Sequence, residues 1–359
     1  MPEGTRRGKT HLAGGRDPFG GRRRGWFVRA GGLAAGLSLG LIFSGCSLGF
    51  LRLGPEESAS LYGEILRDFL PSGDSRNWAY ARGSISGDFN GDGKADEEAL
   101  VVTIQDGTRK RPGNIQTAHL LILSNARDSP RRIIARTELF AGNPIPGAPR
   151  PESELDQATE IPLMNVGAQI IPDPISPKVD LVIYFWGETR PGGVWYAGYS
   201  LENGGALRKI LETSLWQQTP GFLAVNLDKN PESGWKKRQL LFAVPSLPGP
   251  LADRLGKSGE IPLWGHVFAR DDGGNYRQAD RVYAGHYHNI ADKWNQAYLK
   301  ALLDGLPPGD LAWFEYRLGL LNLYTGNPDL AGKFFDRAEK GNADEKLAKA
   351  IRLARSALK

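Results

Sequence analysis

The chain has 359 residues, enough for two or three domains, and its 40% hydrophobic and 24% charged residues are ordinary for a globular protein with a buried core. Its net charge of +5 arises in residues 1–45, which hold eight Arg or Lys and two Asp or Glu, whereas the rest of the chain has 37 basic and 38 acidic residues. The charge therefore gives no reason to expect a nucleic-acid partner.

Residues 1–45 have the build of a secretory signal peptide. The basic stretch GRRRGWFVR is followed by sixteen uncharged residues, AGGLAAGLSLGLIFSG, which are too few and too rich in glycine for a comfortable membrane span. The next stretch, LIFSGCS, resembles the lipobox of bacterial lipoproteins, which Ser44, Gly45 and Cys46 match. The resemblance implies that Cys46 is lipidated, so that the protein is exported and anchored to the bacterial membrane or envelope. The alternative is a free or buried thiol.

Residues 46–76 are expected to form a tether and one short helix. Cys46 is the only cysteine, so no disulfide can form within the chain. The stretch SLYGEILRDFL has apolar residues at helical spacing. They predict one buried face: Leu61, Ile65, Leu66, Phe69 and Leu70.

Residues 77–288 consist of short runs rich in β-branched and aromatic residues, separated by Gly, Pro, Asn and Asp, which is typical of strands and turns. Three uninterrupted apolar runs, EALVVTIQ, VDLVIYFW and RQLLFAVP, are each followed by two further strand-like runs. This repetition predicts about three successive antiparallel sheets. Because continuous apolar runs imply strands that are covered on both faces, the sheets are expected to form a propeller-like arc or a sandwich.

Residues 289–359 show helical spacing, with the clearest pattern from Ile290 onwards. The stretch LAWFEYRLGLLNLYTGNPDLAGKFFDRAEKG resembles one tetratricopeptide repeat. Small residues at Gly319 and Ala331 would let two antiparallel helices approach, and Phe335 would fill the space between them. A single repeat cannot form the usual superhelical groove, so its apolar face must pack on the β region or on another chain. A structural role and a peptide-binding role both remain open.

The stretch GDFNGDGKADEE is the strongest candidate site. Counted from Asp88, oxygen donors fall at positions 1, 3, 5 and 9, with a glycine at position 6 and a backbone carbonyl available at position 7. Position 12 is Ala99 where an EF-hand requires glutamate, so a helix–loop–helix site is not expected. The stretch instead resembles the calcium loop of FG-GAP and VCBS-type repeats, found in integrin-like propellers. The predicted ligands are Asp88, Asn90, Asp92, Lys94 and Asp96.

Calcium is thus the expected cofactor, because three carboxylates within nine residues repel one another unless a cation or solvent screens them. The alternative is a solvated turn held by its own side-chain hydrogen bonds. Asn226, Asp228 and Asn230 precede a later strand and look like a decayed copy of the loop.

Other patterns are weaker. His286 and His288 would lie on one face of a strand as two zinc ligands might, or form a surface pair. Six aromatic residues could make a carbohydrate platform, although aromatic residues in strands also serve as core. They are Trp186, Trp195, Tyr196, Tyr199, Trp235 and Trp264.

Two functions are consistent with these features. The first is a lipid-anchored, non-catalytic binding or scaffold module with a structural calcium site and a protein or glycan ligand. The second is an envelope hydrolase acting on polysaccharide or peptide, with carboxylates such as Asp106, Glu188 and Glu202 gathered by the fold.

Overall fold

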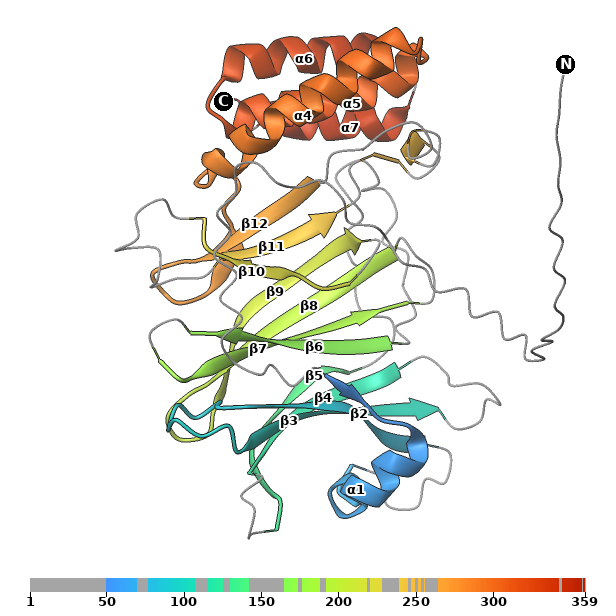
Figure 1. Ribbon diagram of the computed structural model, residues 1–359. Helices are drawn as coiled ribbons and strands as arrows, with labels where there is room; N and C mark the ends of the chain where they lie inside the picture. Colours follow the sequence, from blue (N-terminus) through green and yellow to red (C-terminus); the bar gives the residue numbers. More distant parts are fainter. Residues whose placement is uncertain are drawn as a thin grey trace, which may run out of the picture. The chain divides into compact units, whose positions relative to one another are not determined.

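Antiparallel sheets followed by C-terminal helices make up the described part of the chain (Figure 1). All described residues belong to one compact unit, Ser47–Lys359. The computed structural model describes residues 50–69, 77–106, 115–124, 130–141, 165–173, 176–187, 192–217, 220–227, 239–244, 247–248, 251–252, 255, 264–341, 344–356 and 358.

The strands form three open sheets, and in each sheet neighbouring strands follow one another along the chain. The first sheet contains β1 (Leu51–Arg52), β2 (Asn77–Gly87), β3 (Glu97–Asp106), β4 (Ile115–Ser124) and β5 (Arg132–Ala141). The second contains β6 (Asn165–Pro172), β7 (Val179–Trp186), β8 (Gly192–Leu201) and β9 (Leu207–Gln217). The third contains β10 (Leu223–Val225), β11 (Gln239–Val244), β12 (Trp264–Arg270) and β13 (Tyr276–Gln278).

The mainly antiparallel β fold with C-terminal helices is therefore confirmed. Each of the three continuous apolar runs is a strand, namely β3, β7 and β11, and the two runs after each one supply the next strands of its sheet. Each sheet also has a strand before the apolar run, β2, β6 or β10, that the apolar pattern did not indicate. The first sheet has a further strand, β1, in the segment that was expected to be a tether.

Successive sheets pack face to face, which explains the continuous apolar runs. In β3, Val101 faces a core shared with the second sheet, whereas Leu100 and Val102 face the opposite side. In β7, Ile183 belongs to the core shared with the first sheet, and Val182 belongs to the core shared with the third sheet. Because successive side chains of a strand point to opposite faces, a strand buried on both faces must be apolar throughout.

Helices cover the two outer faces of this stack. Helix α1 (Pro55–Arg67) packs Tyr62 and Leu66 onto the outer face of the first sheet. At the other end, Trp264 of the third sheet shares one core with the C-terminal helices. The helical tail therefore packs on the β region, which confirms one of the two arrangements expected for its apolar face.

The face that α1 buries matches the sequence expectation in part: Leu66 is buried and Ile65 and Phe69 pack against the same core, whereas Leu70 lies outside the described residues. Ser58, Tyr62 and Leu66 are its buried residues, whereas Leu61 remains 48% exposed. The Ser58 hydroxyl accepts a hydrogen bond from the Ala81 amide at 2.7 Å, so a polar residue is the helix's link to β2. Leu61 was placed on the wrong face because hydropathy favours leucine over serine, whereas the buried position requires an acceptor for a strand amide.

The C-terminal region contains α4 (Ala284–Leu303), α5 (Pro308–Tyr324), α6 (Pro328–Gly341) and α7 (Glu345–Ser356). Helix α4 begins before Ile290, where the helical pattern was expected to start. Helices α5 and α6 approach each other closely, as the small residues Gly319 and Ala331 predict. A Cβ atom on Gly319 would lie 2.4 Å from Cε1 of Phe335, and both Ala331 and Phe335 are fully buried.

Replacing Gly319 with alanine is therefore expected to destabilise the protein by about 1 to 3 kcal/mol, because the added methyl group forces Phe335 or α6 to move. The matched control is Gly332→Ala on α6, where a Cβ atom would meet nothing within 4 Å. That change should stabilise the helix by about 0.5 to 1 kcal/mol. Urea unfolding of both variants tests the pair; equal midpoints would show that the helices do not approach as closely as described.

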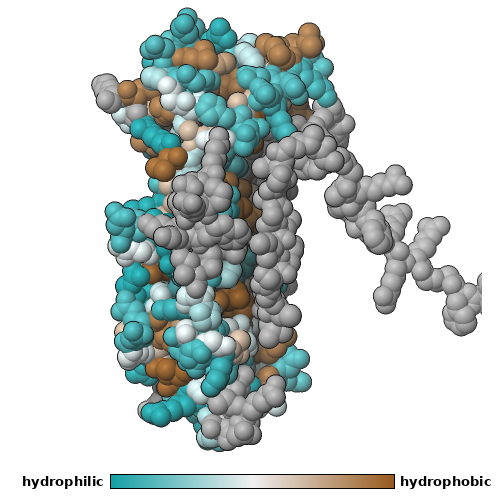
Figure 2. All heavy atoms as spheres, turned by 60° about the vertical axis from the view of Figure 1, so that its left-hand side comes forward, coloured by the Kyte–Doolittle hydropathy of each residue, from teal (hydrophilic) through white to brown (hydrophobic). Residues whose placement is uncertain are grey.

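Several leucines of the helical region remain exposed, among them Leu299, Leu303 and Leu353 at 58%, 87% and 51%. Figure 2 shows hydrophobic side chains among hydrophilic ones at the surface of the helices, at the top of the view. Among the described helices, none is long and apolar enough to cross a membrane.

Candidate functional site

The acidic loop joins β2 to β3, and its first carboxylate is turned into the loop. Asp88 is 6% exposed, and its two carboxylate oxygens accept hydrogen bonds from the amides of Gly91 and Gly93 at 2.6 and 2.8 Å. Both glycines have positive φ angles, 83° and 90°, so the turn depends on residues without a Cβ atom. The spacing of glycines in the sequence therefore serves a real backbone requirement.

Two further predicted ligands also close the loop on itself. The side-chain oxygen of Asn90 accepts a hydrogen bond from the Asp92 amide at 2.7 Å, and Asp92 accepts one from the Lys94 amide at 2.8 Å. Asp92 and Lys94 are exposed, and Asp96 is half-buried. Within the described ranges, no group of three or more His, Cys, Asp or Glu side chains is placed to hold a metal ion.

Glu97 is a central residue of this loop that the sequence analysis missed. It is 2% exposed at the start of β3, and it accepts hydrogen bonds from the Phe89 amide at 2.9 Å and from the Asn90 side-chain amide at 2.5 Å. Burial raises the pKa of Glu97, with Asp96 and Asp88 adding to the rise. The sequence signal that could have identified Glu97 is a carboxylate at the start of an otherwise apolar strand.

The loop also connects the first two sheets. The backbone carbonyl of Asp88 accepts a hydrogen bond from the Val179 amide at 2.8 Å, and Gly91 lies against Lys178. The donor set is chemically suited to a hard cation, because it offers carboxylate, amide and backbone carbonyl oxygens. Any ion held here would act at the junction between the two sheets.

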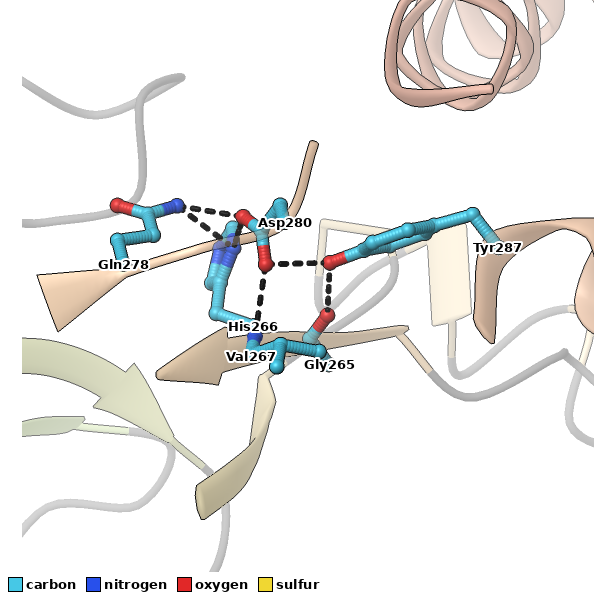
Figure 3. A network of polar contacts seen from close by, with 6 residues as sticks. All are labelled: Gly265, His266, Val267, Gln278, Asp280 and Tyr287. Carbon is cyan, nitrogen blue, oxygen red and sulfur yellow. Dashed lines mark hydrogen bonds and ion pairs between the residues drawn. The ribbon is translucent and has the colours of Figure 1, made fainter. Parts of the chain in front are cut away.

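A second polar cluster lies where the third sheet meets the helices (Figure 3). Its centre is Asp280, which follows β13 and is 4% exposed. One carboxylate oxygen accepts from the Val267 amide at 2.7 Å and lies 2.5 Å from the Tyr287 hydroxyl. The other lies 2.9 Å from Nδ1 of His266 and accepts from the Gln278 side chain at 2.6 Å.

The electrostatics of this cluster favour a charged Asp280. Burial alone would raise its pKa, but the hydrogen bonds and charge of His266, with those of Tyr287 and Gln278, hold the pKa below its ordinary value. Burial beside this carboxylate raises the pKa of Tyr287. Because four protein donors surround one carboxylate and Tyr287 also lies 2.9 Å from the Gly265 carbonyl, the cluster joins β12 to α4.

The histidine pair does not have the expected geometry. His286 and His288 both lie in α4, not in a strand, so their side chains leave the helix about 200° apart instead of on one face. His286 is half-buried against Tyr287, with ring centroids 5.1 Å apart, and His288 is exposed. A helix forms because these residues continue the apolar spacing of α4, whose buried residues include Tyr287 and Trp294.

The aromatic residues proposed as a carbohydrate platform are core residues wherever they are described. Trp186, Trp195, Tyr196, Tyr199 and Trp264 are between 0% and 6% exposed. Both faces of the sheets are covered, so aromatic side chains on either face are buried. The sixth, Trp235, lies outside the described residues.

The remaining candidates are either exposed or not described. Glu202 is 2.8 Å from Arg208, in an exposed ion pair. Asn226 is also exposed. Four candidates lie outside the described residues: Cys46, Glu188, Asp228 and Asn230. Asp106 is the last residue of β3, but its side chain is not described.

Comparisons of the chain with protein-family models, with curated proteins and with solved structures found no match.

Proposed function

We propose that the chain is an exported lipoprotein, anchored through Cys46, whose stacked sheets and helices act as a non-catalytic binding or scaffold module for a protein or glycan at the bacterial envelope. The observation that supports this best is that buried polar groups tie successive layers together. Asp280 joins the third sheet to α4, and Asp180 of β7 forms an ion pair with Arg270 of β12. A module with such links holds the surfaces of its layers at fixed positions relative to one another.

The finer features of the fold belong to the same proposal. The three sheets share one strand order, which suits propeller-like repeats of the FG-GAP or VCBS type arranged as an open arc. The α5 and α6 pair suits a tetratricopeptide-like unit, because Gly319, Ala331 and Phe335 make the close contact that such a pair needs. The outer faces of an open arc must be covered, and the helices at each end do this.

Calcium is the proposed cofactor of the loop. The carboxylates of Asp88, Asp92 and Asp96, the side-chain oxygen of Asn90 and the backbone carbonyl of Lys94 would hold it. When bound, it would supply positive charge among three carboxylates and cross-link the loop. The loop's own hydrogen bonds position Asp88 and Asn90 without an ion, so calcium would reinforce a turn that already exists.

Calcium is expected to raise the stability of the wild-type protein but not that of Asp92→Ala. At ten times its dissociation constant, which for an extracellular site is about 10⁻⁴ to 10⁻³ M, an ion adds about 1.4 kcal/mol to the free energy of unfolding. Thermal unfolding with millimolar calcium and with chelator measures the difference. Asp304→Ala, which removes an exposed carboxylate at the end of α4, is the control and should respond as wild type does. One melting temperature for wild type in both conditions would leave the loop as a hydrogen-bonded turn.

Replacing Cys46 with serine is expected to move the protein from the membrane fraction to a soluble or unprocessed form, because serine cannot carry the thioether-linked lipid. Stable attachment to a bilayer requires about two acyl chains, which a diacylglyceryl group at one residue provides. Fractionation of cells that express each form, followed by mass determination of the N-terminal peptide, measures the effect. Identical fractionation of wild type and Cys46→Ser would contradict the anchor.

A further inference from the structure

Two arginines on neighbouring strands of the first sheet have no carboxylate partner within the described residues. Arg52 lies on β1, directly opposite Gly83 of β2, and the amide of Leu53 donates a hydrogen bond to the carbonyl of Arg82 at 3.2 Å. A Cβ atom on Gly83 would lie 2.4 Å from the Leu51 carbonyl, so the close pairing of these strands requires glycine there. The pairing brings Arg52 and Arg82 to the same rim of the sheet.

Both side chains lie on the face that is turned toward the second sheet. The Arg52 guanidinium lies 5.3 Å from the ring of Trp186 at the end of β7. Arg82 donates a hydrogen bond from Nε to the Thr103 hydroxyl at 2.9 Å, and its guanidinium lies 5.8 Å from the ring of Tyr80. The two guanidinium groups therefore contact aromatic rings and one neutral hydroxyl.

The Arg82 guanidinium is incompletely satisfied. Its Nη2 is shielded from solvent and has no hydrogen-bond partner among the residues that the structure describes. Burial lowers the pKa of Arg82, and the electrostatic effect of Tyr80 offsets this lowering only in part. The N–H groups of a guanidinium match the geometry of phosphate oxygens. An aromatic ring beside a guanidinium accepts none of these hydrogen bonds, so the N–H groups can still donate to a phosphate.

The covalent chain places this rim near the anchor. Only three residues separate Cys46 from Phe50, whose ring packs against the core between the first two sheets. At about 3.6 Å per residue, Cys46 and Phe50 can be at most about 14 Å apart, and Arg52 can be at most about 22 Å from Cys46. A lipid on Cys46 would thus hold β1 near the headgroups of the same membrane.

Charge favours the β1 rim over α1 as the surface that meets lipid. The exposed side of α1 carries Glu56, Glu57 and Glu64 against one basic residue, Arg67, and anionic lipids would repel this net negative charge. The rim instead offers Arg52 and Arg82, and Leu51 between Phe50 and Arg52 is 58% exposed. We propose that Arg52 and Arg82 bind the phosphate of a phospholipid headgroup, so that the β1–β2 rim faces the membrane. This inference rests on the proposed lipidation of Cys46.

The acylated protein offers a direct test, because lipidation leaves no free thiol and a single introduced cysteine can be labelled alone. The mature lipoprotein is reconstituted in vesicles of phosphatidylglycerol and phosphatidylcholine, with a fluorophore on Leu51→Cys or on Leu353→Cys of α7. We expect a lipid-attached quencher to quench the label at position 51 and not the label at position 353. Equal quenching, or none at position 51 in vesicle-bound protein, would overturn the proposal while leaving the anchor intact.

The arginines are tested in the same vesicles. Arg52→Gln, alone and with Arg82→Gln, should reduce quenching at position 51 several-fold, because each basic residue near an anionic surface changes partition about fivefold. Arg352→Gln on α7 is the matched control and should change nothing. Arg52 is exposed, so its variant should fold as wild type does. Quenching that is independent of both arginines would exclude them as the headgroup site.

A second measurement needs no anchor. Thermal unfolding of the full chain with Cys46→Ser is compared in glycerophosphoglycerol, the soluble headgroup, and in inorganic phosphate, each against sodium chloride of equal ionic strength. We expect glycerophosphoglycerol to raise the melting temperature and Arg82→Met to abolish the rise. No rise would refute the site even if Cys46 is acylated, whereas a rise with inorganic phosphate alone would assign the site to free phosphate and overturn the membrane role. A wild-type Cys46 that titrates as a free thiol would contradict only the anchor.

Discussion

A chain that ends at Tyr283, and so lacks α4 to α7, is expected to lose the stable fold of the third sheet. The deletion would uncover the core that the third sheet shares with the helices. In that core Trp264 is fully buried, and Leu247, which follows β11, is 3% exposed. Each large apolar side chain that returns to water costs about 1.5 to 3 kcal/mol, so a few of them reach the total stability of an ordinary domain, about 5 to 15 kcal/mol. Circular dichroism during heating and binding of a hydrophobic dye measure the loss.

The matched control for this truncation is Leu303→Ser at the end of α4. Leu303 is 87% exposed, so removing its apolar side chain should leave the melting temperature unchanged. Together the two variants separate the apolar surface that holds the tail to the sheet from the apolar surface that faces solvent. A truncated chain that melts at the wild-type temperature without binding dye would mean that the helices are a separate module.

Replacing Asp280 with alanine is expected to lower the free energy of unfolding by about 3 to 5 kcal/mol, because it removes a buried acceptor that several donors share. The Val267 amide and the side chain of His266 would lose this acceptor, and the Tyr287 hydroxyl would keep only the Gly265 carbonyl. Their loss would also loosen the junction between β12 and α4. Chemical denaturation at neutral pH measures the effect, and hydrogen exchange at the Val267 amide should rise with it.

Asp280→Asn is the informative companion, because it keeps one oxygen that can accept from Val267 and Tyr287 but removes the charge. It should cost less than Asp280→Ala. The pKa of Asp280 is lowered in the folded protein, so its carboxylate contributes stability that is present above its ordinary pKa and is lost as pH falls through the folded value. The difference between wild type and Asp280→Ala should therefore shrink in strong acid. A difference that stays constant with pH would show that folding does not lower the pKa of Asp280.

Elements whose signal is local can be predicted from the amino-acid sequence alone. The runs that became β3, β7 and β11 could be recognised because a strand covered on both faces must be apolar throughout, whatever covers it. The close pair of α5 and α6 could be recognised because Gly319 and Phe335 have complementary sizes at helical spacing. In the acidic loop, the glycines at positions 91 and 93 marked a turn that needs positive φ angles.

The partners that these elements meet depend on how distant segments pack together. Asp280 gains its role from His266 and Tyr287, which contact it from a different strand and from a helix, and no local pattern pairs them. Strand β10 has three residues and forms because β11 offers it an edge to pair with, so its existence depends on context more than on propensity. Hydrophobic periodicity is a property of neighbouring residues and can be read along the chain. The partner of a buried polar group depends on how distant segments pack, and that is decided by the fold.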